Sequence, residues 1–454
     1  MTPGTLSARP GSNGRWLHPG PTVPATADAV PGASGGARRP EAVRVAYAAL
    51  LVFTAIYYLQ PGEWVPGLIG IPVEKVTGAL ALIAFAVGVV GYGAHRFHWP
   101  KEIIYLIVLF CQLCGAAAFS PIWRGGAFHI VVLDFSKVVL MTIVVVVAVT
   151  TWSRFRKLVM VHALCIGALT LVSLRESELL DGRLMGSLSD RYSNPNDFAL
   201  VMVLVVPLVI ALQMEARSIL KKAFWCSLLC AMAYAVLLTS SRAGFLALLF
   251  AVGICLWEFG VKGPHKAWLF LAGLGIVLFL SASFTTRLGE RLRSTSNPAG
   301  DDIAYQSAQD RRIVFWRSVH VTAEHPLFGV GSGNFAELSG SWHVTHNSFT
   351  ELSAEGGVLA LVLFLLMLWR SFRNLHYAGL ASSDRPEALI WVGATRASLV
   401  AYIVGACFGS YEYQFLPYFL MAYTSVLYRI SGAHDARRPL PRAEFRLEAS
   451  VSET

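Results

Sequence analysis

Long apolar segments alternate with short polar loops along most of the chain. Twelve of these segments are each long enough to cross a bilayer as a helix. They occupy approximately residues 42–59, 72–93, 102–119, 128–150, 156–173, 197–213, 222–239, 243–260, 266–283, 357–375, 387–408 and 411–429. Only helices and closed barrels satisfy their backbone in lipid, and barrel strands would alternate apolar with polar residues. The pattern therefore predicts an all-α fold, a polytopic membrane helical bundle of about 12 transmembrane helices.

Composition agrees with a membrane protein and excludes several other classes. Hydrophobic residues make up 55% of the 454 residues and charged residues 14%, and the mean hydropathy is +0.55. A soluble enzyme, a disordered protein or a secreted disulfide scaffold would not have this balance. The net charge of +9 does not indicate nucleic-acid binding, because Lys and Arg are scattered between apolar segments. The cysteines fall inside apolar segments without metal-site spacing.

The loops predict how the chain is divided across the membrane. Residues 1–40, rich in Pro, Gly, Ala and Ser, are expected to form a disordered cytoplasmic tail, followed by transmembrane helices 1–9 within 41–283. A long periplasmic loop at 284–356 precedes helices 10–12 within 357–429 and a basic cytoplasmic tail at 430–454. The short loops on the side of the amino terminus contain more Lys and Arg than those opposite, which places both termini in the cytoplasm.

The long loop is polar and is expected to be functional and partly helical. It opens with a basic stretch at 287–293, and an amphipathic helix is predicted around 306–323. Arg311 and Arg312 lie on this helix, and Arg312 shares a face with Trp316 because the two are four residues apart. An ordinary solvated helix would fit the same pattern.

Two more outward elements carry arginine. One is the loop that contains Arg183 and Arg191 and ends where Asn194 or Asn196 can cap the sixth helix. The other is a tight turn between two helices that holds Arg242 at the outer interface, beside small hydroxyl side chains. A plain cap and a snorkelling interfacial arginine are the alternative interpretations.

A histidine ends the long loop close to the tenth helix. His346 and Asn347 lie shortly before Gly357, at the mouth of that helix. A histidine at a boundary between water and membrane can act as a base near neutral pH, although a capping or structural role is the alternative. Upstream, Gly329, Gly331 and Gly333 lack the context of a nucleotide-binding loop and are expected to form a tight turn back to the membrane.

Several fixed positive charges and one titratable base are thus predicted on one face of the membrane. The planar fork of arginine suits phosphate oxygens, so a lipid-linked pyrophosphate is a natural ligand. The histidine could deprotonate a hydroxyl that attacks the adjacent sugar carbon, while arginines stabilise the departing pyrophosphate. No metal and no cofactor are expected, since arginines can supply the positive charge.

Ionisable residues inside the predicted helices have their own interpretations. Asp134 and Lys137, three residues apart, are expected to neutralise each other. Arg396 lies near the middle of the eleventh helix, where it either pairs with an acid in the bundle or reaches the pyrophosphate site.

Together these stretches resemble the O-antigen ligase and O-antigen polymerase superfamily of bacterial envelope glycosyltransferases. The resemblance covers approximately residues 180–375. It is carried by Arg183, Gly186 and Asn194-Pro195-Asn196, by Ser240-Ser241-Arg242-Ala243-Gly244, by Arg312 and Trp316 followed by His325-Pro326 and Gly329 to Phe335, and by His346-Asn347 with nine residues before Gly357. The segment from Gln60 to Trp64 is similar to members found with exopolysaccharide and exosortase clusters.

The resemblance implies a membrane glycosyltransferase that acts at the periplasmic face of the bacterial inner membrane. It would move a glycan from undecaprenyl pyrophosphate to a hydroxyl of lipid A–core, with inversion and without a metal. Carried over to this chain, Arg242 and Arg312 would bind the pyrophosphate and His346 would be the general base. Arg183, Arg191, Arg311 and Asn347 would be further substrate-binding residues, with Arg396 as another candidate.

Other functions remain open from the sequence. The sister polymerase would use a second lipid-linked repeat as acceptor, and a further sister would glycosylate a protein hydroxyl. A lipid-glycan transporter is the alternative from another class. It would need ionisable residues along a path through the bilayer, whereas this chain concentrates them on one face.

Overall fold

The computed structural model describes residues 39–90, 99–176, 179–180, 182–187, 190–262, 289, 302–340 and 344–433. The chain divides into two units, Met1–Arg39 and Pro40–Thr454, and the second contains all the features discussed below. Four predicted segments lie wholly or almost wholly outside the described residues: the tails at 1–40 and 430–454, the ninth helix at 266–283 and the basic stretch at 287–293.

The described residues form helices almost throughout. The amino-terminal half contains α1 (Arg39–Leu59), α2 (Pro61–Trp64), α3 (Val73–Val90), α4 (Lys101–Ala118), α5 (Arg124–Phe128), the π-helix η2 (His129–Phe135), α6 (Ser136–Ala148), α7 (Trp152–Glu176), the strands β1 (Leu179–Leu180) and β2 (Arg183–Leu184), the 3-10 helix η3 (Asp190–Tyr192) and α8 (Pro195–Glu215). The remainder contains α9 (Ile219–Leu238), α10 (Arg242–Cys255), the π-helix η4 (Leu256–Val261), α13 (Asp302–Glu324), α14 (Phe335–Leu338), α15 (Ser348–Leu380), α16 (Pro386–Ala406) and α17 (Phe415–Ile430).

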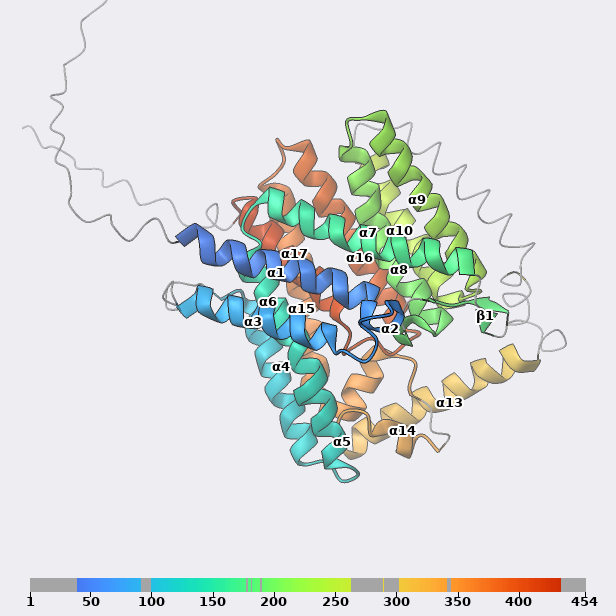
Figure 1. The fold of residues 1–454 in the computed structure, drawn as a ribbon. Coiled ribbons are helices and arrows are strands. Elements are labelled where there is room, and N and C mark those ends of the chain that lie inside the picture. The colour runs from blue at the N-terminus through green and yellow to red at the C-terminus, as the bar shows by residue number, and fades with distance from the viewer. Residues whose placement is uncertain are drawn as a thin grey trace, which may run out of the picture. The chain divides into compact units, whose positions relative to one another are not determined.

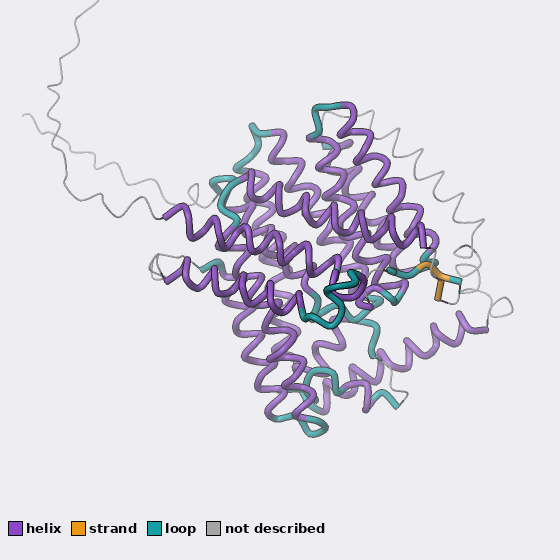
Figure 2. Tube along the Cα trace, viewed as in Figure 1, coloured by secondary structure: helices purple, strands orange, loops and turns teal. Residues whose placement is uncertain are grey.

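This architecture confirms the predicted all-α membrane bundle. Within the described part of the chain, eight helices are long and apolar enough to cross a membrane. The two strands form a single short antiparallel pair in which Leu179 faces Leu184 (Figure 2). The total of about 12 transmembrane helices stays a prediction.

The centre of the bundle is built around α8. This helix packs against α7, α9, α10 and α16, while α15 packs against α4, α16 and α17 (Figure 1). Of the best apolar window in α8, 83% is buried, against 28% in α9. The sequence reflects this difference only weakly, because both helices are apolar on all sides and their environments are set by their neighbours.

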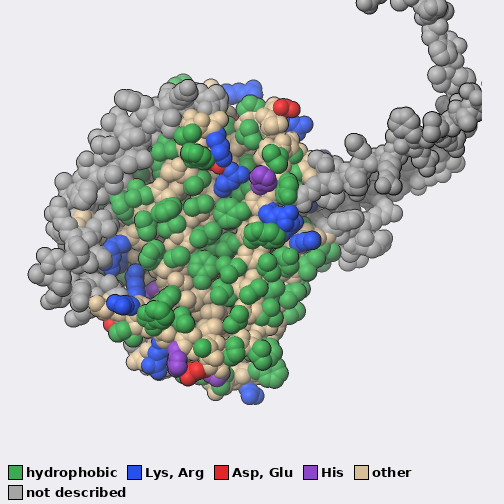
Figure 3. All heavy atoms as spheres, turned by 180° about the vertical axis from the view of Figure 1, so that it is seen from behind, with side chains coloured by type: hydrophobic (Ala, Val, Ile, Leu, Met, Phe, Trp, Pro, Cys, Tyr) green, Lys and Arg blue, Asp and Glu red, His purple; other side chains and the backbone are tan. Residues whose placement is uncertain are grey.

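The outer surface is apolar as well. Figure 3 shows a face covered largely by hydrophobic side chains with few charged ones. Exposed apolar side chains on α9 include Ile219, Leu220 and Phe224. A soluble protein does not expose so much apolar surface, so these side chains are suited to contact lipid.

The glycine-rich turn predicted after His325 packs against a break in α15. At Gly357 the backbone adopts φ 80° and ψ 173°, which interrupts the helix and frees backbone groups. The turn pairs with them: Val358 N donates to Pro326 O at 2.8 Å, and Gly331 N donates to Glu355 O at 2.9 Å. From α4, Gln112 Nε2 donates to Gly356 O at 2.9 Å. The break is therefore part of the packing between the loop and the bundle.

Gly357 is required at this break for two reasons. Its dihedral angles fall in a region that is accessible essentially only to glycine. A Cβ at this position would lie 2.4 Å from Leu327 O. The backbone geometry of α15 therefore explains why the resemblance motif has a glycine at position 357.

We expect Gly357→Ala to destabilise the protein by about 2 kcal/mol or more, because both the backbone strain and the clash would have to be relieved. The measurement is thermal unfolding of the purified protein in detergent. Gly253→Ala is the matched control, since Gly253 lies inside α10 with nothing within 4 Å of its added Cβ. Equal melting temperatures for the two variants would contradict this role of Gly357.

Candidate functional site

A cavity of about 580 Å³ opens between α10, α13, the start of α15 and the segment after α16. Its lining residues are Arg242, Ala243, Phe245, Leu246, Arg311, Arg312, Phe315, Thr345, His346, Asn347, Cys407 and Phe408. Five residues selected from the sequence, Arg242, Arg311, Arg312, His346 and Asn347, therefore meet in one place although up to 105 positions separate them. Arg183, Arg191 and Arg396 are not among its lining residues.

Arg242 is held by the tight turn between α9 and α10. Ser240 adopts a left-handed backbone with φ 50°, and Ser241 caps α10 by accepting a hydrogen bond from Gly244 N at 3.1 Å. A Cβ at Gly244 would lie 2.6 Å from the Cβ of Ala199, so glycine allows α10 to approach α8 closely. Arg242 is the first residue of α10 and projects from a fixed, buried turn.

His346 is held in an unusual backbone conformation. Its φ is 52°, in the left-handed region that a residue with a Cβ rarely adopts. On one side Thr345 Oγ1 donates to Glu351 Oε2 at 2.8 Å. On the other, Asn347 Oδ1 caps α15 by accepting from Phe349 N at 3.0 Å. Both neighbours of His346 are thus fixed to the first turn of α15, which positions the imidazole at the cavity.

The segment that follows α16 closes the other side of the cavity. Asn347 Nδ2 donates to Cys407 O at 3.3 Å, and Ser348 Oγ donates to Gly409 O at 2.7 Å. Ser410 Oγ also donates to Glu351. The start of α15 therefore holds both the backbone around His346 and the segment after α16. Glu351 contacts both, through Thr345 and Ser410.

Helix α13 contributes Arg311, Arg312 and Phe315, and it lies where the sequence predicts an amphipathic helix. Its buried side includes Val314 and Val321, and its hydroxyls reach α15 where Thr322 Oγ1 and Ser353 Oγ are 2.9 Å apart. Trp316 lies four residues after Arg312 on this helix, as predicted for residues that share a face. It is 62% exposed and does not line the cavity.

Arg183 supports the Arg242 turn from outside the cavity. Its Nε donates to Thr239 O at 2.9 Å, and its Nη2 donates to Asn196 Oδ1 at 2.8 Å. Asn194 is the residue that caps α8, by accepting from Asn196 N at 2.8 Å. Arg183 therefore connects the start of α8 to the end of α9, which positions the turn that carries Arg242.

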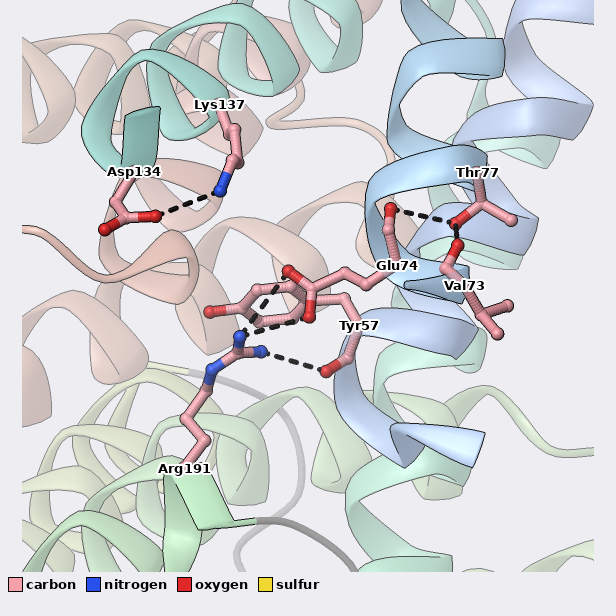
Figure 4. A network of polar contacts seen from close by, with 7 residues as sticks. All are labelled: Tyr57, Val73, Glu74, Thr77, Asp134, Lys137 and Arg191. Carbon is pink, nitrogen blue, oxygen red and sulfur yellow. Dashed lines mark hydrogen bonds and ion pairs between the residues drawn. The ribbon is translucent and has the colours of Figure 1, made fainter. Parts of the chain in front are cut away.

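Arg191 lies at a second cavity. Its guanidinium stacks 3.8 Å from the centre of the Tyr57 ring, donates to Tyr57 O at 3.1 Å and forms an ion pair with Glu74 at 3.2 Å (Figure 4). Arginine stacked on an aromatic ring and paired with a carboxylate is strongly fixed in orientation. Arg191 thus connects η3 to α1 and α3 and does not reach the lining of the first cavity.

Arg396, Asp134 and Lys137, which lie inside predicted helices, form ion pairs in the structure. Arg396 on α16 forms an ion pair with Glu258 of η4, which also pairs with Lys262 at 3.1 Å. Arg396 lies ten residues before the end of α16, about 15 Å along the helix axis, whereas Cys407 just beyond that end lines the cavity. Arg396 thus takes the first of its two alternatives, pairing with an acid in the bundle, and its substrate-binding role stays a prediction. Lys137 and Asp134 pair at 3.0 Å.

The charge and polarity of the first cavity indicate the class of its ligand. Three arginines and one histidine line it, and no carboxylate is among the described lining residues. Phe245, Leu246, Phe315 and Phe408 form apolar walls. A ligand with both an anionic group and an apolar part would satisfy this lining, because arginine binds phosphate oxygens and the walls suit a lipid chain.

One buried carboxyl group was not selected from the sequence. Glu412, in the segment between α16 and α17, is 2% exposed, and among the described residues its Oε2 has no hydrogen-bond partner. Burial raises its pKa well above the usual value of 4.5, and the nearby carboxyl groups of Glu351 and Glu355 raise it further. In the sequence it falls at the start of the predicted segment 411–429, whereas in the structure it precedes α17, and only its surroundings there show its burial.

We expect Glu412 to make stability depend on pH. Because the folded-state pKa is raised, the native state holds the proton more tightly, and stability is highest below pH 4.5 and decreases as the pH rises toward the folded-state pKa. Glu412→Gln should remove a dependence of up to about 1.4 kcal/mol for each pH unit. Melting temperatures from pH 5 to 8 test this, with the exposed Glu337→Gln as control. Parallel curves for wild type and Glu412→Gln would contradict it.

Comparison with known proteins gives a match that covers most of the residues lining the first cavity. Residues 227–365 match the family model for O-antigen ligase. The match begins in α9 and ends in α15, so it includes Arg242, Arg311, Arg312, His346 and Asn347. It confirms the resemblance to the O-antigen ligase and polymerase superfamily. No curated protein sequence matches the chain.

Proposed function

We propose, from the membership of this chain in the O-antigen ligase and polymerase superfamily, that it is an O-antigen ligase-type glycosyltransferase of the bacterial inner membrane. It moves a glycan from undecaprenyl pyrophosphate to a hydroxyl group of lipid A–core at the periplasmic face. The observation that carries this proposal is the cavity in which Arg242, Arg311 and Arg312 meet His346 between apolar walls. Both termini are cytoplasmic in this arrangement.

The lining supports binding of the donor. The pyrophosphate lies between Arg242 on α10 and Arg311 and Arg312 on α13, whose planar forks can each donate hydrogen bonds to two phosphate oxygens. The isoprenoid chain lies against the apolar walls. Because the arginines come from two separate helices, the leaving group is held from two directions before reaction.

His346 provides the base for the transfer step. Its imidazole accepts the proton of the acceptor hydroxyl, whose oxygen attacks the anomeric carbon of the sugar. The bond between that carbon and the pyrophosphate oxygen breaks, and the leaving pyrophosphate takes the electron pair. The arginines stabilise the charge that develops on it, so the reaction needs no metal. Attack opposite the leaving group inverts the anomeric configuration.

The decisive experiment is a transfer assay with the purified full-length protein and an undecaprenyl-pyrophosphate glycan in the presence of a chelator. Glycan on lipid A–core would support the ligase. Longer lipid-linked chains without added lipid A–core would instead indicate the polymerase that the sequence leaves open. His346→Ala should reduce transfer by about 10²–10⁴-fold, as expected for loss of a general base.

His320→Ala is the matched control for that variant. His320 lies on α13, is paired with Glu324 at 3.1 Å and does not line the cavity. Its variant should transfer glycan at the wild-type rate. Unchanged transfer in His346→Ala would remove this residue as the base, and activity that the chelator abolishes would refute the metal-free mechanism.

Arg242→Lys tests the role assigned to the arginine fork. We expect transfer to fall by about 10-fold to 100-fold, because an ammonium group keeps the charge but loses one or two charge-assisted hydrogen bonds to the pyrophosphate. The measurement is kcat/KM for the donor at saturating acceptor. Arg317→Lys is the control, since Arg317 is exposed on α13 and lines no part of the cavity. Wild-type kinetics in Arg242→Lys would leave this arginine only an interfacial role.

A further inference from the structure

The second cavity, at which Arg191 lies, has a volume of about 670 Å³. Its walls come from the end of α1, the turn that contains α2, the start of α3, the junction of η2 and α6, and the segment 413–415. None of its lining residues belongs to the matched family segment at 227–365. The cavity is therefore a feature of this chain that the proposed donor site does not use.

The charges of this cavity are balanced. Its ionisable lining residues other than tyrosine are three acids and three bases: Glu63, Glu74, Asp134, Lys75, Lys137 and Arg191. Two of these acids are matched with bases in direct ion pairs, Glu74 with Arg191 at 3.2 Å and Asp134 with Lys137 at 3.0 Å (Figure 4). A phosphate would gain no net attraction here, in contrast to the first cavity. Paired charges, amides and aromatic rings together suit an uncharged ligand rich in hydroxyl groups.

Gln60 is an independent indication that a ligand binds in the second cavity. Its backbone is left-handed with φ 42°, a conformation that only two other non-glycine residues share among those described, Ser240 and His346. Ser240 lies in the turn that holds Arg242, and His346 is itself a lining residue of the first cavity. Strain of this kind persists where surrounding structure or function maintains it.

The side chain of Gln60 strengthens this indication. Its Oε1 is buried and, within the described part of the chain, accepts no hydrogen bond. Buried polar atoms are nearly always paired, so an unpaired amide oxygen at a polar cavity needs an explanation. This oxygen is not accessible from the open cavity, so a ligand hydroxyl supplies the missing donor only after the Gln60 side chain, which lines the cavity, turns toward it.

The two cavities are connected by one short segment. Cys407 and Phe408 line the first cavity, and Tyr413, Gln414 and Phe415 line the second. The residues between them are fixed to α15, where Tyr411 N donates to Ser348 Oγ at 2.8 Å and Tyr413 OH donates to Glu355 Oε2 at 3.0 Å. Inverting transfer brings the acceptor to the sugar carbon from the side opposite the pyrophosphate. Two cavities lined by opposite ends of this segment provide separate places for the two substrates.

We propose that the second cavity binds uncharged sugar residues of the acceptor, with Gln60 and Gln414 as hydrogen-bonding residues that determine acceptor specificity. This inference rests on the proposed transferase function. It assigns recognition of the acceptor to the amino-terminal helices and leaves the pyrophosphate to the arginines of the first cavity.

Two variants test the assignment, Gln60→Gly and Gln414→Ala. Glycine is the residue best suited to the left-handed backbone at position 60, so this change removes the amide without adding strain. We expect the acceptor KM to rise about tenfold in each variant while kcat and the donor KM stay at wild-type values, as for the loss of one or two hydrogen bonds to a neutral ligand. Gln213→Ala is the matched control, because Gln213 also has a buried, unpaired amide oxygen but lines neither cavity.

A binding measurement keeps this inference separate from the transferase reaction. The affinity of the purified protein for lipid A–core and, in a second arm, for undecaprenyl-pyrophosphate glycan is measured without turnover. Weaker binding of lipid A–core in Gln60→Gly, with donor binding unchanged, supports the acceptor site even if the transfer assay fails. A change in donor binding alone, an equal effect of Gln213→Ala, or wild-type binding of both ligands in Gln60→Gly and Gln414→Ala would overturn it.

Discussion

The break in α15 at Gly357 and the glycine-rich turn that covers it hold the site together. A helix interrupted within an apolar bundle leaves backbone groups that lipid cannot satisfy. Here the backbone of 326–331 and the side chain of Gln112 provide the partners, so the loop that precedes the site is tied to α15 and α4. Because α13 leads directly into this turn, the same contacts determine where Arg311 and Arg312 lie.

The short helical section before the break has a second role. Asn347 caps it at one end and Gly357 terminates it at the other, which explains physically why a His-Asn pair and a glycine are separated by nine residues. Between them, Glu351 and Ser348 connect to Thr345, Ser410 and Gly409. The histidine, its neighbours and the segment after α16 are thus positioned by one rigid section of backbone.

The two cavities differ in a way that follows from their linings. The first has arginine and histidine without carboxylates, and the second pairs each of Arg191 and Lys137 with an acid. The arginines singled out in the sequence therefore have three environments: the first cavity for Arg242, Arg311 and Arg312, a supporting contact for Arg183, and ion pairs for Arg191 and Arg396. Among these environments, the lining of the first cavity contains no acid among the described residues, and this is the property that favours an anionic ligand.

The fold class follows from the sequence alone, since long apolar segments in lipid have few alternatives to helices. The sequence also indicates the main residues of the first cavity, because Arg242 and His346 lie beside turn and cap signals and Arg312 lies on a segment with the pattern of an amphipathic helix. It could not separate Arg183, Arg191 and Arg396 from these, because an arginine looks the same in sequence whether a ligand, a carbonyl or a carboxylate accepts its hydrogen bonds. These partners become visible only in the folded structure, because they come from segments far apart in the chain. The structure also reveals the left-handed backbone of Gln60 and the burial of Glu412, which lies near Glu351 and Glu355 of a helix about 60 positions earlier in the chain.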